Sequence, residues 1–304
     1  MPVIEVKNLT KQYGRNGVTA LDGLDLDINE GEIFGVIGPN GAGKTTLVKI
    51  LLALIRPTHG DAKVFGQSPG KPSTREKIGF LPEDAKFPSF LTGEKVLRYY
   101  GGLAGYHGRN LRTEIDRTLS MLELDSWRKH KVKNYSRGMQ QKLGICQALL
   151  GEPRLLFLDE PTSGIDPVSR RKIRDMIAGL KERGITVMIN SHNLTEIEKL
   201  CDRVAIVKEG KIVRLGTMSQ LTSLKHRIRF NQITEKLEEV LTDCIGTFII
   251  EDKNCITIDV ENQDALNEAI DKIRELKINI LEISPRQTLE DIYIQAVGDN
   301  EVAQ

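Results

Sequence analysis

The sequence predicts an α/β protein built on a mostly parallel sheet with helices on both faces, followed by a small α+β module. Three observations lead to this prediction. An apolar run, a glycine-rich stretch and a helical apolar pattern follow one another over residues 33–54. Predicted strands then alternate with predicted helices as far as residue 217, which is typical of a parallel sheet. Beyond that residue the order of strands and helices changes.

Short antiparallel strands are predicted over residues 3–34. Apolar and polar residues alternate over residues 3–6 and 24–28, and residues 14–17 are a turn signal. Tyr13 lies in this region. Its ring could stack on a purine base, although a single tyrosine is a weak signal and is more often a residue of the core or the surface.

The glycine-rich stretch lies between a predicted strand and a predicted helix, as the Walker A pattern of phosphate-binding loops requires. Its residues are Gly38, Pro39, Asn40, Gly41, Ala42, Gly43, Lys44, Thr45 and Thr46. The glycines let backbone N–H groups converge on a polyphosphate, and the helix N-terminus adds partial positive charge. Lys44 supplies a full charge for the outer phosphates, and the Thr45 hydroxyl suits Mg²⁺. We therefore expect the chain to bind a nucleoside triphosphate.

A helical insertion is predicted after this loop. Residues 78–83 are an apolar strand that ends at Glu83, and residues 92–124 have a helical periodicity that glycines interrupt. A further helix is predicted to begin at Ser136, which is a favourable N-cap residue. This portion, about residues 84–150, is expected to form a helical subdomain beside the sheet.

Two later strands end in polar side chains that suit a ligand site. Residues 154–160 are an apolar run closed by Asp159 and Glu160, and residues 186–192 are a second run that ends at His192. Ligands of α/β proteins bind at the carboxyl ends of parallel strands, which is where these side chains are expected. For the histidine alone, a structural role and a functional role are about equally consistent with this position.

A small module is predicted after the core, which ends in a hairpin at residues 204–213 with a three-residue turn at 208–210. The module has the order strand, helix, strand, strand, helix, strand and a last helix. The βαββαβ order is that of the ferredoxin-like fold. The module has no His/Cys cluster, glycine-rich loop or nucleophile motif, so a regulatory or partner-binding role is expected. The predicted domains are thus residues 1–217 and 218–304.

The composition limits the possible functions. The chain has 304 residues, 39% hydrophobic and 28% charged, as in ordinary globular proteins. No apolar run approaches the roughly 20 residues of a membrane span, and the N-terminus lacks a signal-peptide pattern. Its four scattered cysteines favour buried thiols in a reducing compartment over a zinc site. Aromatic residues make up only 5%, which argues against a base-stacking surface. We therefore expect a cytoplasmic protein.

Six motifs resemble those of the nucleotide-binding subunit of an ATP-binding cassette (ABC) transporter. They are a stacking aromatic residue at Tyr13, the Walker A loop at 38–46, the signature motif at 136–140, the Walker B strand with its following glutamate at 155–160, the D-loop at 163–166 and the switch histidine at His192. The resemblance covers residues 1–217 and is specific, because all six motifs fall in the order that the family has.

Two motifs depart from the family pattern. In the signature, Arg137 replaces the first glycine and Met139 replaces the glutamine. Only Ser136 and Gly138 are retained there. Glu83 stands where the family has its Q-loop glutamine. Both departures, together with the C-terminal module, resemble the single-cassette exporter subunits that pair with a separate ABC-2-type permease.

The resemblance implies an ATPase that uses Mg²⁺. Lys44 and the loop amides would hold the phosphates, and Glu160 would orient the attacking water or accept its proton. Mg²⁺ would be bound by Thr45 and Asp159, and Glu83 would reach the same shell.

The resemblance also implies a dimer of two identical copies that face each other head to tail. His192 would contact the γ-phosphate of ATP bound in its own chain. Ser136 and Gly138 of the other copy would close over the same ATP, and Asp166 of the D-loop belongs to the nucleotide site. ATP binding would close the dimer, and hydrolysis would open it.

The partner implied is a multi-span membrane permease, which would place the chain on the inner face of the cell membrane. No nucleic-acid partner is expected. The alternative is a soluble ABC ATPase that acts on a ribosome or a nucleic-acid complex. That class usually has two cassettes or a long coiled-coil insert, whereas this sequence has one phosphate loop and no sustained heptads.

Overall fold

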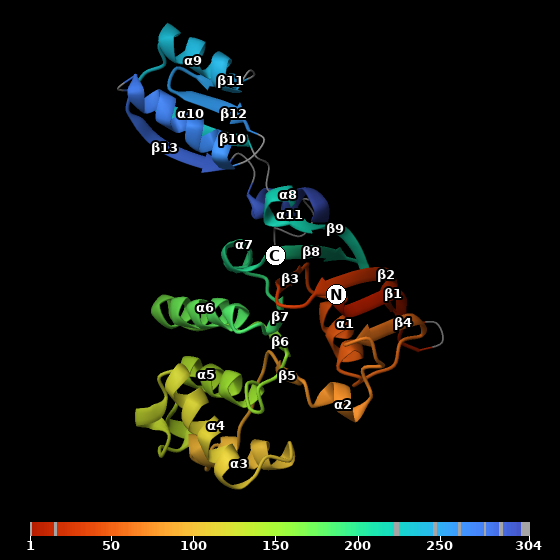
Figure 1. Cartoon of the computed structure of the whole chain (residues 1–304). Helices are drawn as coiled ribbons and strands as arrows, with labels where there is room; N and C mark the ends of the chain where they lie inside the picture. Colours follow the sequence, from red (N-terminus) through yellow and green to blue (C-terminus); the bar gives the residue numbers. More distant parts are fainter. Residues whose placement is uncertain are drawn as a thin grey trace. The chain divides into compact units, whose positions relative to one another are not determined.

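The chain forms two compact units, which are built around Met1–Leu215 and Gly216–Asp299 (Figure 1). The computed structural model describes residues 2–14, 17–221, 225–245, 248–260, 263–276, 278–285 and 288–298. Arg15 and Asn16 of the predicted first turn, and Gly246 at the start of a predicted strand, lie outside these ranges.

The first unit contains a six-stranded sheet in the order β5-β6-β7-β3-β8-β9. Its strands are β3 (Ile33–Ile37), β5 (Ile78–Leu81), β6 (Leu155–Asp159), β7 (Thr186–Asn190), β8 (Arg203–Lys208) and β9 (Lys211–Thr217). The pairs from β5 to β8 are parallel, as the alternation of strands and helices predicts. Strands β3, β6 and β7 are buried along their whole length, which is expected of central strands covered on both faces.

A three-stranded antiparallel sheet, in the order β2-β1-β4, lies on one side of the larger sheet (Figure 1). Its strands are β1 (Pro2–Gln12), β2 (Thr19–Asn29) and β4 (His59–Val64). Helix α1 (Lys44–Leu51) packs against β2 and β4. One hydrophobic cluster joins this sheet and α1 to the core strands through Phe34, Phe157 and Met188.

The remaining helices of this unit belong to the helical insertion or cover the large sheet. They are α2 (Pro72–Arg75), α3 (Gly93–Leu103), α4 (Gly108–Met121), α5 (Arg137–Ala148), α6 (Pro167–Glu182) and α7 (Leu194–Leu200), with 3₁₀ turns at Asp125–Trp127 and Val132–Asn134. Helices α5, α6 and α7 pack against β5, β7 and β3. The predicted helical stretch at 92–124 is two helices, α3 and α4, because the glycines between them interrupt it. Ser136 caps α5 as predicted, with its Oγ accepting from the Met139 backbone N–H at 3.2 Å.

The turn between β8 and β9 is shorter than the three residues predicted. Lys208 continues β8, so only Glu209 and Gly210 form the turn, with φ values of 49° and 78°. Two consecutive residues with positive φ are typical of the tight turn that matches the twist of a hairpin.

The second unit contains a four-stranded antiparallel sheet in the order β11-β12-β10-β13. Its elements are α8 (Met218–Leu221), β10 (Lys225–Phe230), α9 (Glu235–Ile245), β11 (Phe248–Asp252), β12 (Cys255–Asp259), α10 (Gln263–Glu275), β13 (Ile280–Pro285) and α11 (Leu289–Val297). A hydrophobic cluster that includes Phe230, Leu241 and Ile273 joins α9 and α10 to the sheet. The element and strand order confirm the predicted ferredoxin-like module.

None of the described helices has the length and apolarity needed to cross a membrane. The four cysteines are free thiols, of which Cys146, Cys201 and Cys255 are buried and Cys244 is half-buried.

Candidate nucleotide-binding site

The phosphate loop leaves the carboxyl end of β3 and turns directly into α1. Gly43 is the N-cap of that helix, with a φ of 108° that residues with a side chain rarely adopt. A Cβ atom on Gly38 would lie 2.2 Å from the carbonyl oxygen of Val207, so the loop touches the backbone of β8 there. Glycine is therefore required at these two positions for two different reasons.

The β8–β9 turn supports the loop from a distant part of the sequence. The Gly210 backbone N–H donates to the carbonyl oxygen of Ala42 at 3.0 Å, and the Gly210 oxygen accepts from the Asp22 backbone N–H at 3.0 Å. These bonds connect the phosphate loop, the β8–β9 turn and β2. Sequence reasoning missed this support, because the turn signal at Gly210 does not indicate what the turn contacts.

Lys44 lies at the first position of α1, where its ammonium group bonds back onto the loop. It donates to the carbonyl oxygens of Gly38 and Pro39, the latter at 2.9 Å. Burial lowers the pKa of Lys44, and three nearby carboxylates act in the opposite direction. These carboxylates belong to Glu160, Asp159 and Glu83. The predicted lysine and all three predicted acids thus lie in one electrostatic environment.

Asp159 ends β6 and Glu160 follows it, at the edge of the sheet where the parallel neighbour β7 also ends. Both acids are buried. The Glu160 backbone N–H donates to the carbonyl oxygen of Asn190 at 2.9 Å, and Gln141 of α5 donates to the Glu160 carbonyl oxygen at 3.3 Å. Glu160 also has a φ of 50°. Its backbone is therefore held in an unusual conformation from two sides.

The Glu160 side chain is bonded to the segment that follows β7. One carboxylate oxygen accepts from the His192 backbone N–H at 2.9 Å and lies 2.8 Å from the His192 Nδ1 atom. The other oxygen accepts from the Ser191 hydroxyl at 3.4 Å. The His192 side chain is otherwise largely exposed. The predicted base and the predicted switch histidine are thus direct neighbours.

The oxygen atoms at this edge fit a Mg²⁺ ion. Burial raises the pKa of Asp159, and the Asn190 side chain donates to its carboxylate at 3.4 Å. The Oδ1 atom of Asn190 is buried with no donor among the described residues. Within the same ranges, no group of three or more His, Cys, Asp or Glu side chains could hold a metal ion, so Thr45, phosphate and water oxygens would have to complete the shell.

Tyr13 follows β1 and reaches the start of α1. Its hydroxyl lies 3.5 Å from the Thr46 hydroxyl, and the Lys11 ammonium lies 5.2 Å from its ring centroid. The residue is 44% exposed, so Tyr13 is accessible to a ligand beside the phosphate loop.

The signature segment and the D-loop pack against each other within this chain. A Cβ atom on Gly138 would lie 2.6 Å from a methyl carbon of Ile165, so only glycine fits there without a shift. A Cβ atom on Gly164 would lie 2.5 Å from the Arg137 guanidinium carbon. Arg137, the residue that departs from the family signature, therefore lies over the D-loop.

Ser136 and Asp166 each cap a helix. Ser136 caps α5, and the Asp166 carboxylate accepts from the Ser169 backbone N–H at 2.9 Å at the start of α6. Over the described part of the chain, no hydrogen bond or ion pair joins Ser136, Gly138 or Asp166 to the phosphate loop. A single copy therefore brings together the phosphate loop, the acids at the end of β6 and His192, but does not bring Ser136, Gly138 or Asp166 to them.

A buried network that the sequence did not indicate links the D-loop to α7, the helix that follows His192. The Thr162 hydroxyl donates to one carboxylate oxygen of Glu196, and the Arg170 Nε atom lies 3.2 Å from the other. Arg170 also donates to the Ile165 carbonyl oxygen at 3.3 Å. Thr162 and Glu196 are 6% and 8% exposed, so the hydrogen bond between them is largely shielded from water, whereas the contact of Arg170 with Glu196 is an ion pair without a hydrogen bond.

A glycine-rich loop at a helix N-terminus, a half-buried lysine and two acids at the end of a strand of the same sheet define a nucleoside-triphosphate-binding site of the phosphate-loop class. Residues 21–163 match the ABC transporter family.

The relatives extend this match over nearly the whole chain. The daunorubicin/doxorubicin resistance ATP-binding protein DrrA of Streptomyces peucetius is 33% identical over 307 residues, which cover 97% of this chain and 92% of DrrA. A fluoroquinolones export ATP-binding protein of Mycobacterium tuberculosis is 39% identical over 229 residues, 75% of each chain. The chain belongs to the family of ABC transporter ATP-binding proteins.

Solved structures of ATP-binding cassettes have the same fold as the first unit of this chain. The ATP-binding cassette MJ0796, in a dimeric post-hydrolysis state with ADP and phosphate, has a TM-score of 0.65 and 28% identity. The match covers 71% of this chain and 98% of MJ0796. The chain is thus the ATP-binding subunit of an ABC transporter and an ATPase. The alternative role on a ribosome or nucleic acid is not supported.

Proposed function

We propose that two copies of this chain bind ATP between them and drive export through a separate multi-span permease. The observation that carries the proposal is the bonding of Glu160, whose carboxylate is held by Ser191 and His192 next to Lys44. Relatives named for drug resistance and fluoroquinolone export support the direction of transport. In this proposal the chain works at the cytoplasmic face of the membrane through its permease.

In the proposed mechanism, Lys44 gives up its bonds to the loop carbonyls and pairs with the outer phosphates of ATP. The loop amides at residues 38–46 hold the same phosphates, and the Tyr13 ring stacks on adenine. Thr45 and Asp159, with Glu83 nearby, would hold Mg²⁺. The ion would neutralise charge on the phosphates.

Glu160 orients the attacking water and accepts its proton, while His192 holds the carboxylate and contacts the γ-phosphate. Ser191 fixes the other carboxylate oxygen, so Glu160 has little freedom to turn away from the water. Pre-oriented groups of this kind lower the barrier because they need no rearrangement during reaction.

The second copy supplies the residues that a single chain keeps apart from its phosphate loop. Ser136 and Gly138 present the α5 N-terminus to the ATP of the opposite copy, and Asp166 lies at the same interface. Arg137 is exposed next to them, so its guanidinium adds a full positive charge where the family has glycine. Met139 and Glu83 take no role in this step.

The helical subdomain offers a surface for the permease. Three large apolar side chains there are more than half exposed. They are Phe90, which precedes α3, and Tyr99 and Leu103, which lie one turn apart on α3. Large apolar side chains exposed together mark surfaces that bind other proteins.

We assign residues 1–217 to the ATP-binding domain and residues 218–304 to an accessory regulatory domain.

The dimer is tested with the Glu160→Gln variant, which should hold ATP without cleaving it. Sedimentation should show a monomer without nucleotide and a dimer with ATP. The same variant carrying Ser136→Phe should remain a monomer, because the bulky ring blocks the signature segment. A Glu160→Gln chain that binds ATP but stays monomeric would contradict the shared site.

The permease is tested by isolating the tagged chain from membranes of its own host. A hydrophobic protein with several predicted spans should co-purify with the wild-type chain. Substitution of Tyr99 and Leu103 by serine should reduce that yield, whereas serine at Val168, exposed on α6, should not. Recovery of ribosomal proteins alone would overturn the proposal.

A further inference from the structure

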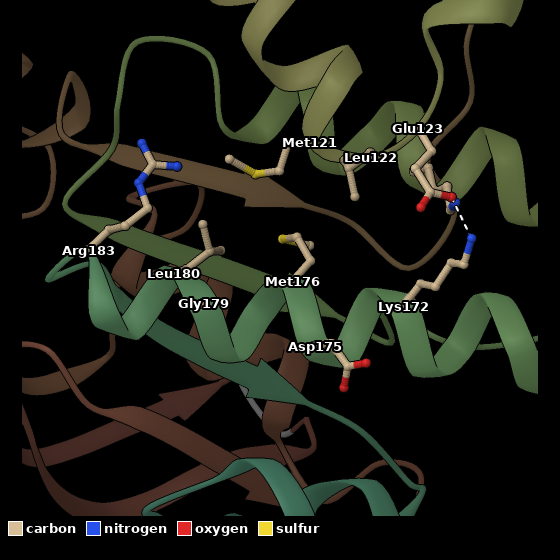
Figure 2. A pocket seen from close by; sticks show the side chains of 10 residues that line it. Met121, Leu122, Glu123, Lys172, Asp175, Met176, Gly179, Leu180 and Arg183 are labelled. Atoms are coloured by element: carbon tan, nitrogen blue, oxygen red, sulfur yellow. Dashed lines mark hydrogen bonds and ion pairs between the residues drawn. The ribbon is translucent and has the colours of Figure 1, made fainter.

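A cavity of about 400 Å³ lies between α4, α5 and α6, and none of its lining residues belongs to the nucleotide-binding site (Figure 2). Met121, Leu122 and Glu123 close it at the end of α4. Lys142 of α5 lines it, and the opposite wall is formed by residues of α6 between Lys172 and Leu180 and by Arg183, which follows that helix. A volume of this size is within the range of small-molecule sites.

The middle of the cavity is apolar. Figure 2 shows Met121 and Leu122 on one side, facing Met176 and Leu180 of α6 on the other. Leu122 and Leu180 are otherwise buried, and methionine side chains adapt readily to ligands of different shape. These walls suit a compact apolar body.

Lys142 provides the charge. The residue is only 8% exposed and forms no direct hydrogen bond or ion pair in the described ranges of the chain, although the pKa of the Glu123 carboxyl is lowered by its bond to Lys172 and also by the charge of Lys142. An ammonium group that bonds to no carboxylate directly can form a charge-assisted hydrogen bond with an anion that enters the cavity.

The other charged groups of the lining already have partners. Glu123 forms an ion pair with Lys172 at 2.6 Å, drawn as a dashed line in Figure 2. Asp175 lies 3.8 Å from the guanidinium groups of Arg171 and Arg174. Glu123, which follows α4, pairs directly with Lys172 of α6 and only partly offsets the nearby charge of Lys142, so the two lysines carry more positive charge than this one carboxylate neutralises.

We propose that this cavity binds a small organic anion with a compact apolar body, whose anionic group pairs with Lys142. Such a ligand would contact α4, α5 and α6 together. Its binding does not depend on nucleotide, because the cavity shares no lining residue with the phosphate loop. The test can therefore use the nucleotide-free full-length chain.

Gly179 allows the cavity to be filled without a steric conflict. It lies in α6 on the cavity wall, and a Cβ atom built on it would meet no atom within 4 Å. Gly179→Leu should occupy the space of the ligand. Because leucine has a higher helix propensity than glycine, the substitution should not destabilise α6 through its backbone. Gly179→Ala is the matched control, since a single methyl group leaves most of the volume open.

The probes are 1-anilinonaphthalene-8-sulfonate and the neutral N-phenyl-1-naphthylamine, which has the same rings without the sulfonate. Both are followed by fluorescence titration. The wild-type chain should bind the sulfonate more tightly. Lys142→Met should weaken sulfonate binding about tenfold or more and leave the neutral probe unchanged. Gly179→Leu should weaken both probes, and Gly179→Ala neither.

Circular dichroism of each variant, together with ATP binding, shows that the chain remains folded. Sulfonate binding that stays within twofold of wild type in both Lys142→Met and Gly179→Leu would place the probe elsewhere and overturn the proposal. Equal loss of both probes in Lys142→Met would overturn the pairing with the anion.

Discussion

The Nδ1 atom of His192 lies 2.8 Å from the Glu160 carboxylate, and the His192 backbone N–H donates to the same oxygen at 2.9 Å. One residue therefore fixes this oxygen through both its ring and its backbone. The two residues come from the ends of neighbouring strands, β6 and β7, that are separated by a helix and a loop in the sequence. Their pairing is the basis of the first prediction.

Replacement of His192 by alanine should reduce the rate of ATP hydrolysis about 10²-fold, the lower end of what a group that assists proton transfer contributes. Ser191 and the backbone N–H remain, so Glu160 stays close to its place while the imidazole contact to phosphate is lost. ATP affinity should change little, since Lys44 is intact. His107→Ala, at the N-cap of α4, is the control. A His192→Ala turnover number within threefold of wild type would remove this residue from the reaction.

Tyr13→Ala should weaken ATP binding roughly tenfold, because base stacking on an aromatic ring contributes about 1–3 kcal/mol. Tyr13→Phe keeps the ring and loses only the 3.5 Å contact to Thr46, so its affinity should remain near wild type. Calorimetric titration measures both. Tyr99→Ala, on exposed α3, controls for loss of a surface tyrosine. If Tyr13→Ala binds ATP as well as Tyr13→Phe does, the stacking role is wrong.

Gly38→Ala should destabilise the chain by about 1–3 kcal/mol, the usual cost of overpacking a closely packed site. The new Cβ atom would lie 2.2 Å from the Val207 carbonyl oxygen, which is held in β8 and cannot move alone. ATP affinity should also fall. Gly102→Ala is a matched control, because a Cβ atom there meets nothing within 4 Å. Thermal unfolding of the two variants at equal midpoints would show that the loop tolerates the methyl group.

Thr162→Val and Glu196→Ala should each destabilise the chain by about 1–3 kcal/mol, since each leaves a buried polar partner unsatisfied. The double variant should lose clearly less free energy of unfolding than the two single variants lose together. The difference, a coupling energy of about 0.5–3 kcal/mol, is measured by denaturant unfolding. Turnover should fall in all three variants, because this network joins the D-loop to the helix after His192. Glu198→Ala, elsewhere on α7, serves as the reference. Strictly additive costs would mean that the bond contributes nothing.

Local sequence patterns predicted most elements and the main group of site residues. The strand, loop and helix around Lys44, the acidic end of β6 and the βαββαβ order of the second unit are all local signals. The strand order β5-β6-β7-β3-β8-β9 could not be predicted from local patterns. It depends on which strands pair after the chain has passed through the connecting helices and loops. The contacts of Gly210 with Ala42 and of Glu196 with Thr162 depend on that order in the same way.

The residues that can hold phosphate and deliver carboxylates could be predicted from local sequence, because backbone conformation and apolar periodicity within a few residues specify those features. Long-range packing, in contrast, made β6 and β7 neighbours and so brought His192 next to Glu160. It also decided that α4, α5 and α6 leave a cavity around Lys142. Both results depend on packing between segments far apart in the chain. Local sequence patterns do not predict which side chains such packing brings together.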